Sequence, residues 1–112
     1  LLAKNPAGWS EALRMARPDA GLVIAVNARA ADGRDPSWLW DVPFEVLRGR
    51  RAIASGERSR DVAVRLRYAG VDHVRIDDLA AAARAAGDGE ERVEVLANYT
   101  AFQGYRKVVG DA

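Results

Sequence analysis

The sequence contains no cysteine and a single histidine, His73. Without cysteine the chain offers no disulfide framework, no thiolate metal site and no thiol nucleophile, and this composition suits a reducing compartment. We expect His73 to be a surface residue, because it lies in the charged segment Asp72-His73-Val74-Arg75 at the start of a short predicted strand. A hydrolase site complete within this chain is therefore not predicted.

Long apolar runs and an excess of one charge are also missing. No run approaches the roughly 20 apolar residues that span a bilayer, and no signal-peptide pattern opens the chain, so we expect no transmembrane segment. Lys and Arg total 17 against 16 Asp and Glu, and the basic residues are spread along the sequence. That distribution predicts no nucleic-acid partner. The nucleophile-elbow, zincin and P-loop motifs are absent as well.

The sequence does contain a regular alternation of strand and helix patterns over 112 residues, the length of one domain. The predicted strands are Leu1–Ala3, Gly21–Val26, Arg51–Ala54, Val74–Ile76 and Arg92–Ala97. The predicted helices are Pro6–Ala16, Pro43–Arg48, Ser59–Ala69, Leu79–Ala86 and a last one that follows Thr100 and ends near Val109. This alternation predicts a single α/β, Rossmann-like domain with a mostly parallel sheet and helices on both faces.

Several side chains suit the expected helix ends. Asn5 is the expected N-cap of the first helix, with Pro6 at its first position. Asp77 and Asp78 are expected to cap the alanine-rich helix, and Gly70 to end the helix before it. That earlier helix, Ser59–Ala69, is predicted to bury Val62, Leu66 and Ala69 and to turn outward Arg60, Asp61, Arg65 and Arg67.

The loop Asn27–Asp41 concentrates polar side chains directly after the most apolar predicted strand. Asp32 precedes a glycine and is expected to form a turn, and Asp41 is expected to cap a short helix. Asp35 precedes Pro36, so we expect extended backbone there and no structural role for its carboxylate. Two guanidinium groups are expected to keep these acids ionised, those of Arg29 and Arg34. Because the arginines alternate with the acids and no EF-hand spacing is present, we expect no metal site.

Two tryptophans end this loop. Trp38 and Trp40 would point to opposite sides of an extended segment, so we expect one to pack inward. The other is then available to a protein partner, because tryptophan is enriched at interface hot spots.

Three further loops should lie at the same edge of the sheet, where parallel α/β proteins bind ligands. They are Lys4–Pro6, Ser55–Arg58 and Asn98–Thr100. Helices are expected to open at Asn5 and Thr100, so their N–H groups would face an anionic ligand or simply be capped.

Five stretches, in order along nearly the whole chain, resemble the MurT C-terminal domain family. They are Leu2–Trp9, Ala31–Asp41, Ser55–Arg58, Leu66–Val71 and Leu96–Thr100. The chain departs from the family pattern at Ser10 and at Arg29-Ala30, outside the acidic core of the second stretch.

The resemblance implies the fold of Mur ligase C-terminal domains and a role in a ligase that pairs with a GatD-type glutamine amidotransferase. Such a complex uses ATP and Mg²⁺ to amidate the D-glutamate α-carboxylate of lipid II, a step of peptidoglycan synthesis. Residues 1–112 would then be part of a longer chain, lacking the ATP-binding domain that precedes them, inactive alone and needing no cofactor of their own. The expected location is the cytoplasm, at the inner face of the bacterial membrane.

The resemblance also implies site residues. It matches Asp35 to an aspartate that completes the partner glutaminase's catalytic triad, with Asp32 as the alternative. By analogy with Mur ligases, the residues facing substrate or nucleotide are Lys4, Asn5, Arg34, Asn98 and Thr100. A non-catalytic α/β module that docks a partner through the tryptophan loop is the rival hypothesis. A stand-alone nucleotide-binding protein is disfavoured, because no Gly-rich phosphate loop is present.

Overall fold

The structure is a computed structural model that describes residues 6–18, 20–29, 35–87, 93–98 and 100–101. Within them, four strands form one sheet in the order β3-β2-β1-β4, and all three pairings are parallel. The strands are β1 (Gly21–Ala25), β2 (Arg51–Ser55), β3 (Asp72–Arg75) and β4 (Val93–Ala97). The predicted parallel sheet is confirmed, and β1 lies inside it, as its apolar sequence indicated.

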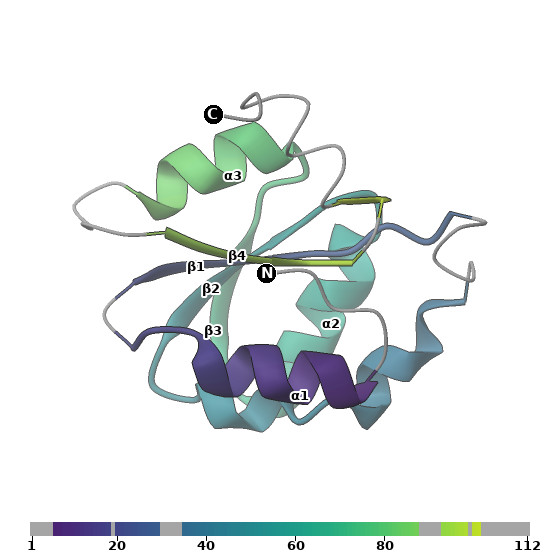
Figure 1. Cartoon of the computed structure of the whole chain (residues 1–112). Coiled ribbons are helices and arrows are strands. Elements are labelled where there is room, and N and C mark those ends of the chain that lie inside the picture. Colours follow the sequence, from purple (N-terminus) through teal and green to yellow (C-terminus); the bar gives the residue numbers. More distant parts are fainter. Residues whose placement is uncertain (1–5, 19, 30–34, 88–92, 99, 102–112) are drawn as a thin grey trace.

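Helices cover both faces of this sheet, as predicted (Figure 1). α1 (Pro6–Met15) and α2 (Ser59–Ala69) lie on one face, and α3 (Leu79–Ala86) lies on the other. Two short 3₁₀ helices connect β1 to β2, η2 (Pro36–Asp41) and η3 (Phe44–Leu47). None of the helices in the described ranges is long and apolar enough to cross a membrane.

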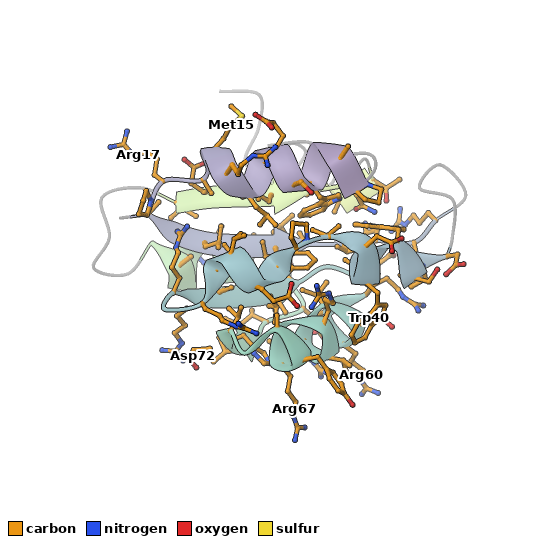
Figure 2. All side chains as sticks on the ribbon, turned by 90° about the horizontal axis from the view of Figure 1, so that it is seen from below. Met15, Arg17, Trp40, Arg60, Arg67 and Asp72 are labelled. Atoms are coloured by element: carbon orange, nitrogen blue, oxygen red, sulfur yellow. The ribbon has the colours of Figure 1, made fainter. Side chains whose placement is uncertain are left out.

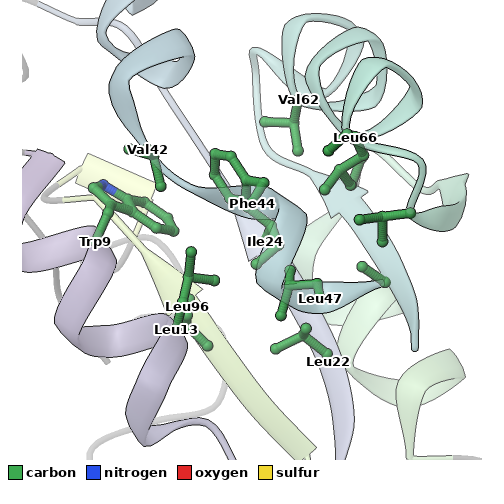
Figure 3. Close-up of a cluster of buried hydrophobic side chains, with 14 of the residues drawn as sticks. Trp9, Leu13, Leu22, Ile24, Val42, Phe44, Leu47, Val62, Leu66 and Leu96 are labelled. Atoms are coloured by element: carbon green, nitrogen blue, oxygen red, sulfur yellow. The ribbon is translucent and has the colours of Figure 1, made fainter. Parts of the chain in front are cut away.

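The larger core lies between the sheet and the layer of α1, η3 and α2 (Figure 3). Trp9 of α1 is fully buried, with its ring centroid 6.1 Å from that of Phe44. Leu22 and Ile24 of β1 point into the same core, where they meet Leu66 of α2. Each such side chain stabilises the fold by about 1.5–3 kcal/mol through burial alone. The core thus anchors the segment between β1 and β2.

The smaller core, under α3, is built from small side chains. Val23 of β1 and Ile53 of β2 pack there against Ala82 and Ala86. The alanines let α3 approach so closely that a Cβ at Gly21 would lie 2.0 Å from the Ala86 carbonyl oxygen. The close packing of α3 on the sheet therefore requires both the alanines of α3 and the glycine at position 21.

The ends of α2 and α3 follow local chemistry. α2 begins and ends at the predicted residues, and Gly70 closes it in the left-handed conformation at φ 75°. Asp78 caps α3 as predicted, accepting from the Ala81 N–H. Asp77 instead accepts a hydrogen bond from the Ser59 hydroxyl, so its predicted capping role is wrong. The predicted strand Leu1–Ala3, the Asn5 cap and most of the last predicted helix lie outside the described residues.

Candidate functional site

The carboxyl ends of the strands meet at one edge of the sheet, where two asparagines join three loops. The Asn27 N–H donates a 3.0 Å hydrogen bond to Asn98 Oδ1, and Asn98 Nδ2 donates back to the Asn27 carbonyl. Asn27 Oδ1 also accepts from the Glu57 N–H at 2.9 Å. Both asparagines are buried, so these bonds hold the ends of β1, β2 and β4 together in a place shielded from water.

Asp35 lies where the described chain resumes beyond this edge. Its backbone is extended, at φ −92° and ψ 114°, as the following proline predicted. Its Oδ1 accepts a 2.9 Å hydrogen bond from the Ser37 N–H and caps η2. The expectation that this carboxylate has no structural role is therefore wrong. The cap fixes an exposed carboxylate at the start of η2.

The electrostatic surroundings of Asp35 favour its ionised form. Hydrogen bonds from Ser37, first from its N–H and then from its side chain, hold the pKa of Asp35 below its ordinary value. The positive charge of Arg58 lowers that pKa further. Asp35 is thus an acceptor at neutral pH.

A basic residue outside the loop after β1 also acts on Asp35. We expected Arg29 to keep the acids of its own loop ionised. Arg29 forms a two-pronged ion pair with Glu57, with a shortest N–O distance of 2.6 Å, and its expected effect on the acids of its own loop stays a prediction. Among the described residues, the positive charge that lowers the pKa of Asp35 belongs to Arg58, at the start of α2, and that residue also pairs with Asp61.

A hollow of about 260 Å³ lies beside Asp35, between η2 and α2. Its lining residues include Asp35, Trp40, Val64 and Asp61. A larger hollow, of about 720 Å³, lies at the amino ends of β1 and β2 and is lined by Arg50 among others. The volume of a hollow does not by itself identify the functional site. The smaller one holds Asp35 and is lined by α2, the helix that follows the carboxyl end of β2.

The two tryptophans point in different directions, as predicted. The Trp38 ring lies 5.6 Å from the Trp9 ring and packs against the larger core, whereas Trp40 is 54% exposed. The expected cause was wrong, because the segment is a 3₁₀ helix and not extended. With three residues per turn, positions two apart still point about 120° apart around the axis.

Arg65 corrects the prediction for α2. We expected it to point outward, but it is 4% exposed. Its guanidinium donates to the carbonyl oxygens of Leu39 and Val42 at 2.9 and 2.6 Å, and to both carboxylate oxygens of Glu45 at 3.0 Å. The helical spacing of Val62, Leu66 and Ala69 gave no sign that Arg65 would be buried. The groups that turn it inward, two carbonyls and a carboxylate, lie 20 to 26 residues away in the sequence.

Asp41 does not cap the second short helix, contrary to the prediction. It is the last residue of η2, and the residue before η3 is Pro43, which makes no side-chain capping bond. His73 is half-buried in the edge strand β3, with Nδ1 2.8 Å from the Val71 carbonyl oxygen.

The remaining predicted site residues are only partly visible. Lys4, Asn5, Asp32 and Arg34 lie outside the described residues. Asn98 is buried against Asn27, and Thr100 is half-buried in a helical turn. Their proposed contacts with substrate stay predictions. No group of three or more His, Asp or Glu side chains able to hold a metal occurs in the part of the chain that the structure describes.

Comparison with known proteins places the sequence of this chain in a family. Residues 2–102 match the family described as MurT ligase C-terminal. The "Lipid II isoglutaminyl synthase (glutamine-hydrolyzing) subunit MurT" of Staphylococcus aureus (strain COL) is 40% identical over 77 residues, covering 63% of this chain and 18% of that protein. The protein of the same name from Streptococcus pneumoniae is 31% identical over 119 aligned positions, covering 97% of this chain and 27% of that protein. The chain thus spans about a quarter or less of these curated relatives, and it belongs to the MurT ligase C-terminal family.

Proposed function

We propose that this domain is the C-terminal part of the ligase subunit of a glutamine-hydrolysing lipid II isoglutaminyl synthase. The family match and the names of the relatives support this assignment. The reaction would activate the D-glutamate α-carboxylate of lipid II with ATP and replace the phosphate with ammonia. A GatD-type glutaminase subunit would release that ammonia from glutamine. The complex would work in the cytoplasm, at the inner face of the membrane that carries lipid II.

Within this complex, Asp35 would complete the triad of the glutaminase. The partner would supply the cysteine nucleophile and the histidine base, since this chain has no cysteine. A carboxylate in the third position accepts the histidine N–H, orients the ring and stabilises the imidazolium that forms. The observation that carries the proposal is the state of Asp35, which is exposed, ionised and held by Ser37 beside an open hollow.

The ligase half of the reaction involves residues that the structure describes only in part. ATP and Mg²⁺ would be held mainly by the domain that the resemblance places before this one. Lys4, Asn5, Arg34, Asn98 and Thr100 would face the cleft between the two domains, where a cation stabilises the developing acyl phosphate. We expect Arg34→Ala to slow ligation in the complete complex, and unchanged ligation kinetics would remove Arg34 from this role.

The test of the triad is Asp35→Asn in the complete ligase subunit, purified with its glutaminase. Asparagine keeps the size and the acceptor for Ser37 but removes the charge. We expect glutamine hydrolysis to fall by up to about 10⁴-fold, the loss typical of this change in a triad. Ligation fed with ammonium salt should persist, because that route bypasses the glutaminase. Asp32→Asn is the comparison variant, because Asp32 is the alternative triad residue. If Asp35→Asn left glutamine hydrolysis unchanged and Asp32→Asn abolished it, Asp32 would hold the triad role.

A second function has an observation of its own, the exposed Trp40 beside Asp35. The domain would then be a non-catalytic module that docks a partner through the tryptophan loop. Assembly of the complex with full glutamine hydrolysis in both aspartate variants would favour this module over the triad.

A further inference from the structure

Three exposed apolar side chains lie together beside Asp35. Trp40 of η2 is 54% exposed, and Val64 and Tyr68 of α2 are 47% and 73% exposed. Val64 and Trp40 line the hollow that also holds Asp35, and Tyr68 contacts Trp40. We call Trp40, Val64 and Tyr68 the α2 patch. Large apolar groups gathered at one place on a surface mark an interaction site.

The α2 patch is held in shape without a partner. The Tyr68 ring meets the Trp40 ring edge-on, with centroids 5.5 Å apart and an interplanar angle of 65°. The guanidinium carbon of Arg65 lies 5.3 Å from the Trp40 centroid, and Arg65 is itself fixed by main-chain carbonyls. A ring clamped in this way loses little freedom on binding. Trp40 is therefore a preorganised anchor.

Basic side chains border the patch. Arg60, Val64, Arg67 and Tyr68 follow the spacing of one helix face, and Figure 2 shows Trp40, Arg60 and Arg67 on the same side of the molecule, away from Met15. Among the described residues, no carboxylate forms an ion pair with Arg60 or Arg67. The patch thus has an apolar centre, with Arg60 and Arg67 on its border along α2 and with Asp35 and Asp61 at the adjoining hollow.

We propose that the α2 patch is the docking surface for the glutaminase subunit, and that the subunit covers it with apolar side chains rimmed by acidic ones opposite Arg60 and Arg67. The inference rests on the proposed function. A partner that brings a histidine to Asp35 enters the hollow that Trp40 and Val64 also line, so the two sites are continuous. A buried apolar centre with a charged rim is the anatomy of protein interfaces.

The experiment measures the Kd between the complete ligase subunit and the glutaminase for two double variants. Val64→Ser with Tyr68→Ser removes the apolar centre, and Arg60→Glu with Arg67→Glu inverts the rim. These residues are chosen because Trp40 also packs on Arg65, so its loss would disturb the fold. The matched controls, Met15→Ser for exposed apolar surface and Arg84→Glu for charge, lie on α1 and α3. Thermal unfolding verifies that every variant is folded.

We expect the serine pair to raise Kd by roughly 10- to 100-fold, the loss found at interface hot spots. The glutamate pair should raise Kd and reverse its dependence on salt, because like charges then face each other. Kd values within about twofold of the control variants would overturn the docking surface. So would a homodimer of the ligase subunit that the serine pair dissolves without changing glutaminase affinity.

These results are separable from the proposed function. Normal affinity in both patch variants, together with lost hydrolysis in Asp35→Asn, overturns the docking surface and supports the triad. Weakened affinity with unchanged hydrolysis in Asp35→Asn supports the docking surface and removes the triad role.

Discussion

Arg65 and Leu39 are 26 residues apart in the sequence, yet Arg65 Nε donates a 2.9 Å hydrogen bond to the Leu39 carbonyl oxygen. The same guanidinium reaches the Val42 carbonyl and the Glu45 carboxylate. One side chain of α2 therefore holds the end of η2 whose start carries Asp35. The position of the candidate site depends on this buried cation.

Replacing Arg65 should destabilise the fold. In Arg65→Met the Leu39 and Val42 carbonyls each lose a hydrogen bond from a charged donor, worth about 1.5–3 kcal/mol, although each still accepts a backbone N–H, from Val42 and Phe44 respectively. Arg65→Lys should lower the free energy of unfolding by a smaller amount, because an ammonium keeps the charge but cannot donate in several directions as the planar guanidinium does. Urea unfolding measures the difference. Arg67→Met, exposed on the same helix, is the control and should stay within about 0.5 kcal/mol of the unmodified chain.

Gly56 and Gly49 allow backbone strain to be separated from steric overlap. Both have positive φ, 87° and 90°, but a Cβ at Gly56 would lie 2.6 Å from the Val26 carbonyl oxygen, whereas one at Gly49 would meet nothing within 4 Å. Gly49→Ala should cost roughly 1–2 kcal/mol for the left-handed conformation alone. Gly56→Ala adds the overlap and should cost above about 3 kcal/mol.

Unfolding midpoints of these two variants check the comparison directly. Equal losses would contradict the close approach of the β2–α2 turn to the end of β1.

The asparagine pair at the sheet edge should contribute more to the free energy of unfolding than its two hydrogen bonds would alone. Asn98→Ala leaves the buried N–H and carbonyl of Asn27 without their side-chain partner, at a cost of about 1–3 kcal/mol per unsatisfied group. Denaturant unfolding measures the loss, and amide exchange at Asn27 should accelerate. Ser10→Ala, which removes a half-buried hydroxyl bonded within α1, should change stability by less than about 0.5 kcal/mol.

Stability should depend on pH through Glu45. Hydrogen bonds from Arg65 hold the pKa of Glu45 below its ordinary value of 4.5. A carboxyl whose pKa is depressed by folding stabilises the fold above its unfolded pKa, and this stabilisation is lost as pH falls through the folded pKa. Because Glu45 is 43% exposed, the effect should be about 1 kcal/mol or less at pH 7.

The measurement is the unfolding free energy of Glu45→Gln against the unmodified chain from pH 7 to pH 3. The gap should narrow as pH falls, and it should vanish in an Arg65→Met background. A gap that is constant with pH would contradict the ion pair. Asp35 shifts in the same direction, so only the paired comparison isolates Glu45.

Local patterns were sufficient for the fold class and, among the described residues, for the order of the α-helices and strands. α2 begins and ends where its apolar spacing and Gly70 predicted, and Pro36 held Asp35 extended as expected. Such features follow from interactions within about one turn of helix, or from the restricted φ of proline, so neighbouring residues encode them.

The roles of particular polar side chains were decided by contacts between distant segments. Arg65 turns inward because η2 and η3 present two carbonyls and a carboxylate to it, and Asn98 is buried because β1 and β4 are neighbours. The sequence by itself determined an α/β domain with an acidic loop after its central strand. Only the tertiary structure decided that the Arg65 charge is buried and that Trp40 is the more exposed of the two tryptophans. A polar group is stable in the interior only where a partner from elsewhere in the chain satisfies it, and that pairing exists only once the chain has folded.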